Sequence, residues 1–292
     1  MRWHHSCLIL PLLAVLTACS TTARIKAEQT LAQALISDEE EVKLGLQVQE
    51  ELKKQNVKYL DDAEVVGYVQ KVSSRLFPFA EKDRPGVKWQ VFVIDDPKTV
   101  NAFATPGGFL YVYTGLILAA DNEAELAGVM GHEAGHVVGR HSARQMVSAY
   151  GLQAVTSMAL GENPGMVAQV AAGLTGQGAL LAHGRGAEIE ADEFGARYTS
   201  AAGYDPKGIS TFFEKIQAQQ GSMPGFLTFL SSHPATEERI SHIGQFITQN
   251  NLKGTDTGAD RIAPIKAKLK ARPQPPEPKA VPGQTPTTTP SK

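Results

Sequence analysis

GVMGHEAGHVVGRH, residues 128–141, places two histidines and a glutamate inside an apolar run. The apolar residues recur with a 3.6-residue period, which predicts a buried helix from Glu123 to His141. On this helix His132 and His136 lie four residues apart on one face, so their imidazoles can reach one metal ion. Glu133 lies about 100° further round and can take the proton of a zinc-activated water. The alternative is that the two histidines and the glutamate lie on a solvated face of the helix, but the residues around them are too apolar for a solvent-exposed face.

The stretch EIEAD, residues 188–192, offers a third zinc ligand on a predicted later helix from Ala187 to Ala202. Glu188 and Asp192 are four residues apart and share a face, whereas Glu190 points away from both. Glu188 is therefore the predicted ligand. Asp192 is predicted to accept a hydrogen bond from the outer nitrogen of a zinc-bound histidine, and Glu190 is expected to be solvated. The alternative is an acidic helix start favoured by the helix dipole.

The remaining patterns predict an α+β, mainly α domain over residues 37–250 with a small mixed sheet. Residues 87–94 and 109–113 are rich in β-branched and aromatic residues and predict strands. Helices are predicted after the capping box SDEE at residue 37, over 62–77, and at the two prolines that follow Asp205 and His233. For residues 146–182, a mobile helical hairpin or lid and plain core helices remain equal alternatives.

Both ends of the chain are predicted to lie outside this domain. Residues 1–18 have the layout of a secretory signal peptide, and LTAC at its end resembles a lipobox. Cys19 would then be the lipidated residue, followed by a tether over 19–36. Seven of the 17 prolines follow Ala271, together with a run of threonines, and residues 251–292 are expected to form a flexible tail.

Composition excludes two classes of function. The only cysteines are Cys7, in the predicted signal peptide, and Cys19, so no thiol is left for nucleophilic catalysis. The formal net charge of −2 gives no general attraction to nucleic acid. His141 and His183 have no ligand spacing and are expected to be surface histidines or to support the site from behind.

The motifs together resemble one family. HEAGH at 132–136, ExxAD at 188–192, and His233-Pro234 followed by Arg239 are similar to gluzincin metallopeptidase family forty-eight, of the HtpX-like and CAAX prenyl protease type. The resemblance covers about residues 38–250. Within the family it is closest to periplasmic lipoprotein peptidases of the LoiP and BepA kind. It implies a zincin-like domain with an active-site helix.

The resemblance also implies roles for individual residues. One zinc ion per chain would bind His132, His136 and Glu188, with catalysis by Glu133 and support from Asp192.

Other site residues follow from the same resemblance. His233 and Arg239 would sit near the metal and help to hold the substrate or the developing oxyanion, and His233 could block the zinc in a latent enzyme. From the residues alone, a histidine before a proline more often caps a helix. The segment NAFATPGG, residues 101–108, resembles the family's edge strand, which makes a substrate cradle of Asn101, Ala102, Phe103 and Ala104. A core strand with a turn is the alternative.

The predicted function is a zinc-dependent endopeptidase of the bacterial cell envelope, lipid-anchored to the outer membrane and facing the periplasm. The family implies misfolded or misassembled envelope proteins as substrates and the assembly machinery of outer-membrane proteins as a partner. Two alternatives remain: a latent protease that acts mainly as a chaperone-like assembly factor, and a hydrolase of peptidoglycan peptides.

Overall fold

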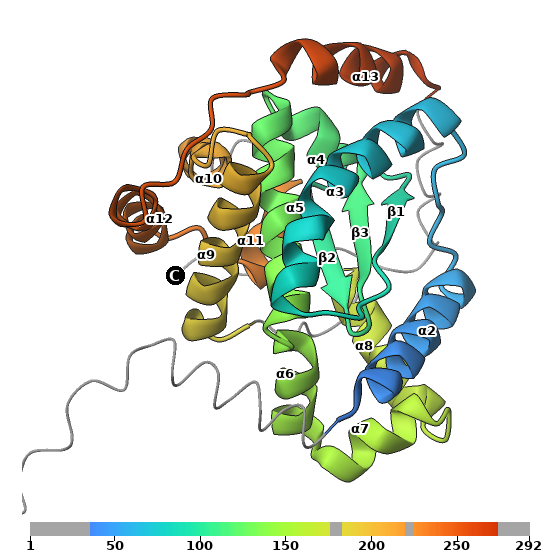
Figure 1. Cartoon of the computed structure of the whole chain (residues 1–292). Helices are drawn as coiled ribbons and strands as arrows, with labels where there is room; N and C mark the ends of the chain where they lie inside the picture. The colour runs from blue at the N-terminus through green and yellow to red at the C-terminus, as the bar shows by residue number, and fades with distance from the viewer. Residues whose placement is uncertain (1–35, 176–182, 220–224, 274–292) are drawn as a thin grey trace, which may run out of the picture.

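The computed structural model describes residues 36–175, 183–219 and 225–273 (Figure 1). The predicted signal peptide, the predicted lipidation site Cys19, nearly all of the predicted tether and the last part of the expected tail lie outside these residues. The chain order is α2 (Asp38–Lys54), α3 (Ala63–Asp83), β1 (Gln90–Ile94), β2 (Ala102–Thr105), β3 (Phe109–Tyr113), α4 (Thr114–Ala119), α5 (Glu123–Val138), α6 (His141–Tyr150), α7 (Leu152–Ala159), α8 (Pro164–Leu174), α9 (Arg185–Ala201), α10 (Gly208–Ala218), α11 (Phe226–Ser232), α12 (Glu237–Gln249) and α13 (Ala259–Ala271). The predicted α+β, mainly α class is confirmed.

The sheet has the strand order β1-β3-β2, with β1 parallel and β2 antiparallel to β3. Side chains alternate between its two faces. Leu110 and Val112 join the apolar core formed with α3, α5 and α9, whereas Phe103 and Tyr111 face α2 and the helices α7 and α8. Because both faces are covered, β2 and β3 are entirely buried although β2 is an edge strand.

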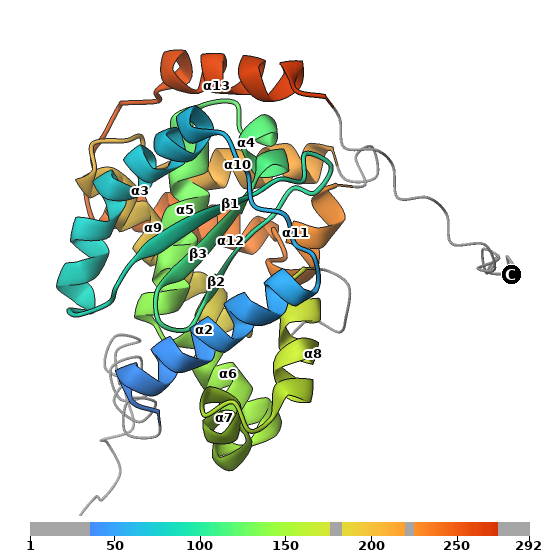
Figure 2. The ribbon, with the colours of Figure 1, turned by 90° about the vertical axis from the view of Figure 1, so that its right-hand side faces the viewer.

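The described part of the segment 146–182 packs as core helices. In Figure 2, α2 crosses in front of the sheet, and α7 and α8 lie beside it. Buried apolar side chains from α7 and α8, including Met158 and Val167, pack with Leu44 and Val48 of α2. This is the second of the two alternatives predicted for the segment.

The helix α5 lies at the centre of the molecule, and all of its residues are buried. It packs most closely against α9, because small residues let the two backbones approach. A Cβ added to Gly195 would lie 3.0 Å from the backbone nitrogen of His132, and one on Gly135 would lie 3.0 Å from the Cα of Ala191. The close approach brings the first turns of α9 beside the histidines of α5.

One helix boundary differs from the prediction in a way that bears on the site. The helix predicted at His233-Pro234 begins at Glu237, because Thr236 is its N-cap and accepts a hydrogen bond from the backbone nitrogen of Arg239. His233 instead ends α11, and the proline after it cannot continue that helix.

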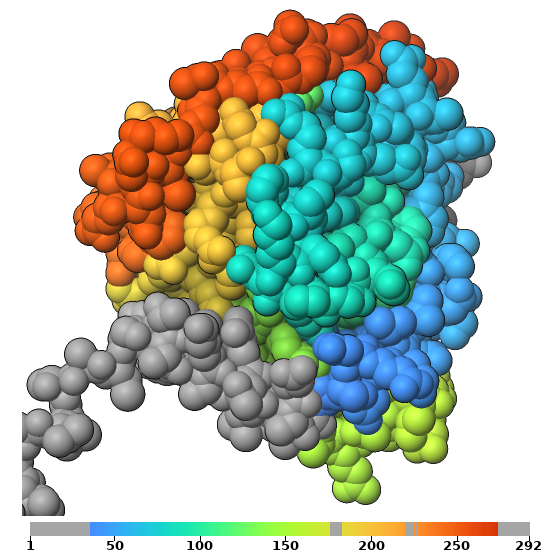
Figure 3. Space-filling model, in the orientation of Figure 1, coloured from blue at the N-terminus to red at the C-terminus, as the bar shows by residue number. Residues whose placement is uncertain are grey.

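The expected tail over 251–292 is wrong in its first part. Residues 259–271 form α13, which packs on α3 and α4 and covers the top of the molecule in Figure 3. Ile262, Ile265 and Leu269 recur on one face of this helix and are buried in the main core. The fold therefore continues to about residue 271, where the proline-rich sequence begins.

Within the described ranges, no helix is both long and apolar enough to cross a membrane.

Candidate metal centre

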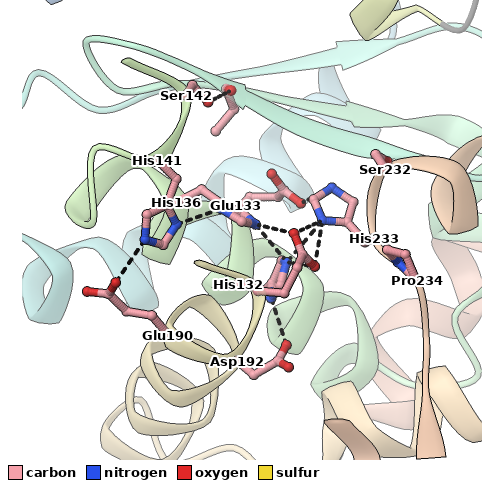
Figure 4. A network of polar contacts seen from close by, with 12 residues as sticks. His132, Glu133, His136, His141, Ser142, Glu190, Asp192, Ser232, His233 and Pro234 are labelled. Carbon is pink, nitrogen blue, oxygen red and sulfur yellow. Dashed lines mark hydrogen bonds and ion pairs between the residues drawn. The ribbon is translucent and has the colours of Figure 1, made fainter. Parts of the chain in front are cut away.

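Four buried side chains from three parts of the chain converge on one point (Figure 4). His132 and His136 come from α5, Glu188 from α9, and His233 from the end of α11. Their ligand atoms all lie within 4.8 Å of one another. The Nε2 atoms of His132 and His136 are 3.0 Å apart, and His233 Nδ1 is 3.2 Å from both carboxylate oxygens of Glu188. We call these four residues the ligand cluster.

The outer nitrogen of His132 is held by Asp192. His132 Nδ1 lies 2.9 Å from Asp192 Oδ1, and Arg239 grips both oxygens of that carboxylate at 2.7 Å each. Since Nδ1 donates to the carboxylate, the lone pair of Nε2 faces the cluster, as a metal ligand requires. Arg239 Nη1 also lies 2.7 Å from Glu188 Oε2. Arg239 therefore holds two carboxylates in place, Asp192 behind the cluster and Glu188 within it.

The outer nitrogen of His136 is held differently. His136 Nδ1 lies 2.8 Å from Nδ1 of His141, whose Nε2 lies 3.0 Å from a carboxylate oxygen of Glu190. Glu190 is only 5 % exposed, so the expectation that it is solvated is wrong. It points away from Glu188 as predicted, but α6 covers that side of α9. His141 is buried and supports the site from behind, which was one of its two predicted places.

The position of His141 depends on the turn between α5 and α6. Arg140 adopts a left-handed conformation, with φ of 57°, and its guanidinium lies 2.6 Å from the buried carboxylate of Glu41. A Cβ on Gly139 would lie 2.3 Å from His141 Nε2. One feature of the sequence indicates this arrangement: His141 follows soon after HEAGH, and Gly139 lies two residues before it.

His183 lies just before α9, and its ring stacks on that of His136 with centroids 4.1 Å apart. Burial and the neighbouring His233 lower its pKa to about 3. It is therefore a neutral imidazole beside the cluster.

Glu133 lies at the cluster but is not one of its four members. One of its carboxylate oxygens makes no hydrogen bond among the described residues and is 3.4 Å from His233 Nε2. Burial raises the pKa of Glu133 to about 7, with His233 opposing the shift and Glu188 adding to it. Near neutrality this carboxylate can take up or release a proton, as a general base must.

The donor set fits a divalent cation. Burial lowers the pKa of His132 and of His136, so both imidazoles are neutral ligands near pH 7. Burial alone would raise the pKa of Glu188, but His233 and His136 hold it well below its ordinary value. Burial alone would lower the pKa of His233, yet the carboxylates of Glu188 and Glu133 raise it. A buried carboxylate and three imidazoles that share one point are typical of a metal centre.

The predicted substrate cradle borders the cluster. Asn101 and the strand residues Ala102, Phe103 and Ala104 are buried. The backbone N–H of Ala104 forms a hydrogen bond with the Glu133 carboxylate, which lowers the pKa of Glu133. The side-chain oxygen of Asn101 has no hydrogen-bond partner among the described residues. The structure thus brings Ala104 of the edge strand to Glu133 at the site.

Comparisons with known proteins give related sequences. The profile of a family described as peptidase family M48 matches residues 64–247. The mitochondrial metalloendopeptidase OMA1 of Schizosaccharomyces pombe is 33 % identical over 186 residues, which are 64 % of this chain and 54 % of that protein. The beta-barrel assembly-enhancing protease of Escherichia coli K12 is 32 % identical over 193 residues, 62 % of this chain and 39 % of that protein.

The metalloprotease LoiP of the same bacterium is 33 % identical over 175 residues, 57 % of this chain and 65 % of that protein. In each of these comparisons, this chain spans less than two thirds of the relative's length.

Proposed function

Since this chain belongs to peptidase family M48, we propose that it is a zinc-dependent endopeptidase. The observation that carries the proposal is the convergence of His132, His136 and Glu188 beside a carboxylate, Glu133, that is not one of the four clustered ligands. Two imidazoles and one carboxylate form the protein ligand set of many catalytic zinc sites. The family itself was predicted from HEAGH and the two later motifs, and that prediction is confirmed.

Zinc, when bound, would polarise the peptide carbonyl and lower the pKa of water. Glu133 accepts the proton of the attacking water as the new C–O bond forms. It then delivers that proton to the leaving nitrogen as the C–N bond breaks. The pKa of about 7 in the metal-free protein places this carboxylate close to the range where such transfers are efficient. Asp192 keeps the His132 imidazole in its ligand tautomer throughout.

The edge strand β2 would hold the substrate backbone. A peptide added to the edge of this strand would pair through its backbone, which gives affinity without selecting a sequence. Ala104 places this strand at the site, because its backbone N–H acts on Glu133. Asn101, Ala102, Phe103 and Ala104 therefore remain our proposed backbone-binding residues.

His233 supports a latent form of the enzyme. Its Nδ1 lies 3.2 Å from His132 Nε2 and from Glu188, within the ligand cluster. There it would fill the position that a catalytic zinc keeps open for water or substrate. Turnover then requires the end of α11 to move away. This geometry favours, as a second candidate function, a latent protease that mainly assists the assembly of other proteins.

The cellular setting rests on other grounds. The lipobox-like sequence at Cys19 supports an outer-membrane lipoprotein that faces the periplasm. One relative is named a beta-barrel assembly-enhancing protease, which supports misassembled envelope proteins as substrates and their assembly machinery as a partner. Another is named a mitochondrial metalloendopeptidase, so relatedness alone does not fix the compartment. Labelling of the protein with a radioactive fatty acid tests the proposed lipid anchor, and the label should be absent from Cys19→Ala.

The central experiment measures bound metal and casein cleavage together. Glu133→Gln is expected to keep stoichiometric zinc and lose turnover, whereas Glu188→Ala is expected to lose both. Glu193→Ala is the matched control, because Glu193 lies on the same helix and pairs with His242 outside the cluster. Zinc retained at full stoichiometry in Glu188→Ala, or cleavage retained in Glu133→Gln, would refute the assignment.

A further inference from the structure

A pocket lies between the end of the edge strand β2 and the helices α6 and α8. Val48 of α2 forms part of its wall. Its other lining residues include Ala104, Met146, Tyr150, Val170, Leu174 and His183. The helices that carry them belong to the segment 146–182, to which the proposed chemistry assigns no role.

The pocket adjoins the ligand cluster through two residues. His183 lines the pocket and stacks on the ring of His136. Ala104 lines it as well, and its backbone N–H acts on Glu133 while its carbonyl accepts a hydrogen bond of 3.5 Å from the Ser142 hydroxyl. Figure 4 shows Ser142 against the strand, on the same side of the site as His136 and His141. A peptide lying along β2 over the cluster therefore passes the mouth of the pocket.

Six of the eleven lining residues are apolar, and the other five, Thr105, Ser142, Gln145, Tyr150 and His183, are polar but uncharged. Val48, Met146 and Val170 are each at least 91 % buried, and Leu174 is partly buried. Among the described residues that line the pocket, none is Asp, Glu, Lys or Arg. A charged side chain placed there would lose its hydration without gaining a charged partner. An aliphatic side chain would gain contacts with four apolar residues.

We propose that this pocket receives an apolar, aliphatic-sized side chain of the substrate, next to the scissile bond, and that α6 and α8 determine cleavage specificity. The inference rests on the proposed peptidase function and names its substrate class. Large apolar residues are mostly buried in folded proteins. A requirement for one beside the cleaved bond therefore directs the enzyme to unfolded segments of polypeptide.

The test uses quenched fluorescent peptides that are identical except for Ala, Leu, Phe or Asp at one position, with the cleaved bond located by mass spectrometry. The metal-loaded wild type should favour Leu over Asp and Ala by about tenfold or more in kcat/KM. Leu174→Trp, which narrows the pocket, should lower kcat/KM for the Leu peptide more than for the Ala peptide and so remove the preference for Leu. Leu174→Ala should shift the preference toward Phe. Gln169→Trp, on the exposed side of the same helix, is the control and should behave as wild type.

A second measurement separates the pocket from the chemistry. The same peptides, labelled with a fluorophore, are titrated with metal-loaded Glu133→Gln, with and without Leu174→Trp, and binding is followed by anisotropy. If the wild type cleaves none of the peptides, the proposed function fails. The pocket is still supported if adding Leu174→Trp to Glu133→Gln weakens binding of the Leu peptide but of no other peptide. Equal effects of Leu174→Trp and Gln169→Trp on all peptides, in cleavage and in binding, would overturn the pocket proposal.

Discussion

Replacement of His141 by Phe should weaken metal binding although His141 is not a ligand. His136 can present Nε2 to a metal only if its Nδ1 carries the proton, and that proton is donated to His141 Nδ1 at 2.8 Å. His141 in turn donates from Nε2 to Glu190 at 3.0 Å. Phe keeps a ring of similar size in the space beside Gly139, but it removes the acceptor. The Nδ1–H of His136 would then be buried without a partner.

The expected loss follows from this geometry. Removing a group that orients a metal-bound histidine typically lowers metal affinity by about 10- to 100-fold, which corresponds to roughly 1.4–2.7 kcal/mol. The buried unsatisfied N–H should cost the metal-free fold a further 1–3 kcal/mol or so.

The assay is competition for zinc against a chromogenic chelator, with circular dichroism to establish that each variant is folded. His242→Phe is the matched control, because His242 forms a 2.8 Å contact with Glu193 of α9 outside the cluster. Its removal should leave zinc affinity unchanged. A folded His141→Phe protein whose Kd for zinc stays within about twofold of wild type would show that His141 does not orient His136.

Three further predictions follow from other contacts. Gly139→Ala should lower zinc affinity in the same competition assay, because the new Cβ would lie 2.3 Å from His141 Nε2, whereas Gly165→Ala, which meets nothing within 4 Å, should not. In the metal-free, folded protein the pKa of Glu133 is about 7, above its ordinary value of 4.5. The contribution of Glu133 to the free energy of unfolding is therefore greatest below pH 4.5 and declines as the pH rises to 7. Urea unfolding should therefore show that the free energy of unfolding falls less steeply with pH over that interval in Glu133→Gln than in the wild type. Equal slopes in the two proteins would contradict the raised pKa of Glu133. Ile265→Ala should lower the free energy of unfolding by about 2–5 kcal/mol in the same measurement, and a loss near zero would mean that α13 does not share the main core.

The shared face of His132 and His136 could be predicted because their relation is local. Two histidines four residues apart on a helix share a face whatever the rest of the chain does. The same rule separates Glu188 and Asp192 from Glu190 within one helix. The bounds of α5 followed from periodicity alone, and the structure ends that helix at Val138, three residues before the predicted limit.

The partners of Glu190 could not be predicted, because its contact with His141 is not local. The two residues are 49 positions apart and meet only because the chain reverses at Arg140. That residue holds its left-handed conformation while its side chain pairs with Glu41, a residue 99 positions away. A helical wheel shows that Glu190 points away from Glu188, but it does not show that α6 covers that direction.

The docking of α13 was missed for a related reason. Proline-rich sequence after Ala271 suggested a tail, and Pro264 within the helix weakened its periodic signal. The helix is held by a charge that is distant in sequence, because Arg261 lies 2.9 Å from Glu123, and Arg261 also lies 2.8 Å from the nearby Asp256. Glu123 also begins α5, so the same contacts that hold the C-terminal helix fix the start of the active-site helix.

The charges of the ligand cluster explain how so many carboxylates are buried together. Glu188 and Asp192 are balanced by Arg239, and the raised pKa values of His233 and Glu133 place additional protons among them when no cation is bound. A divalent cation supplies the same positive charge, so its binding must displace protons from these groups. The site is therefore electrostatically satisfied in two ways, by protons on His233 and Glu133 or by a divalent cation.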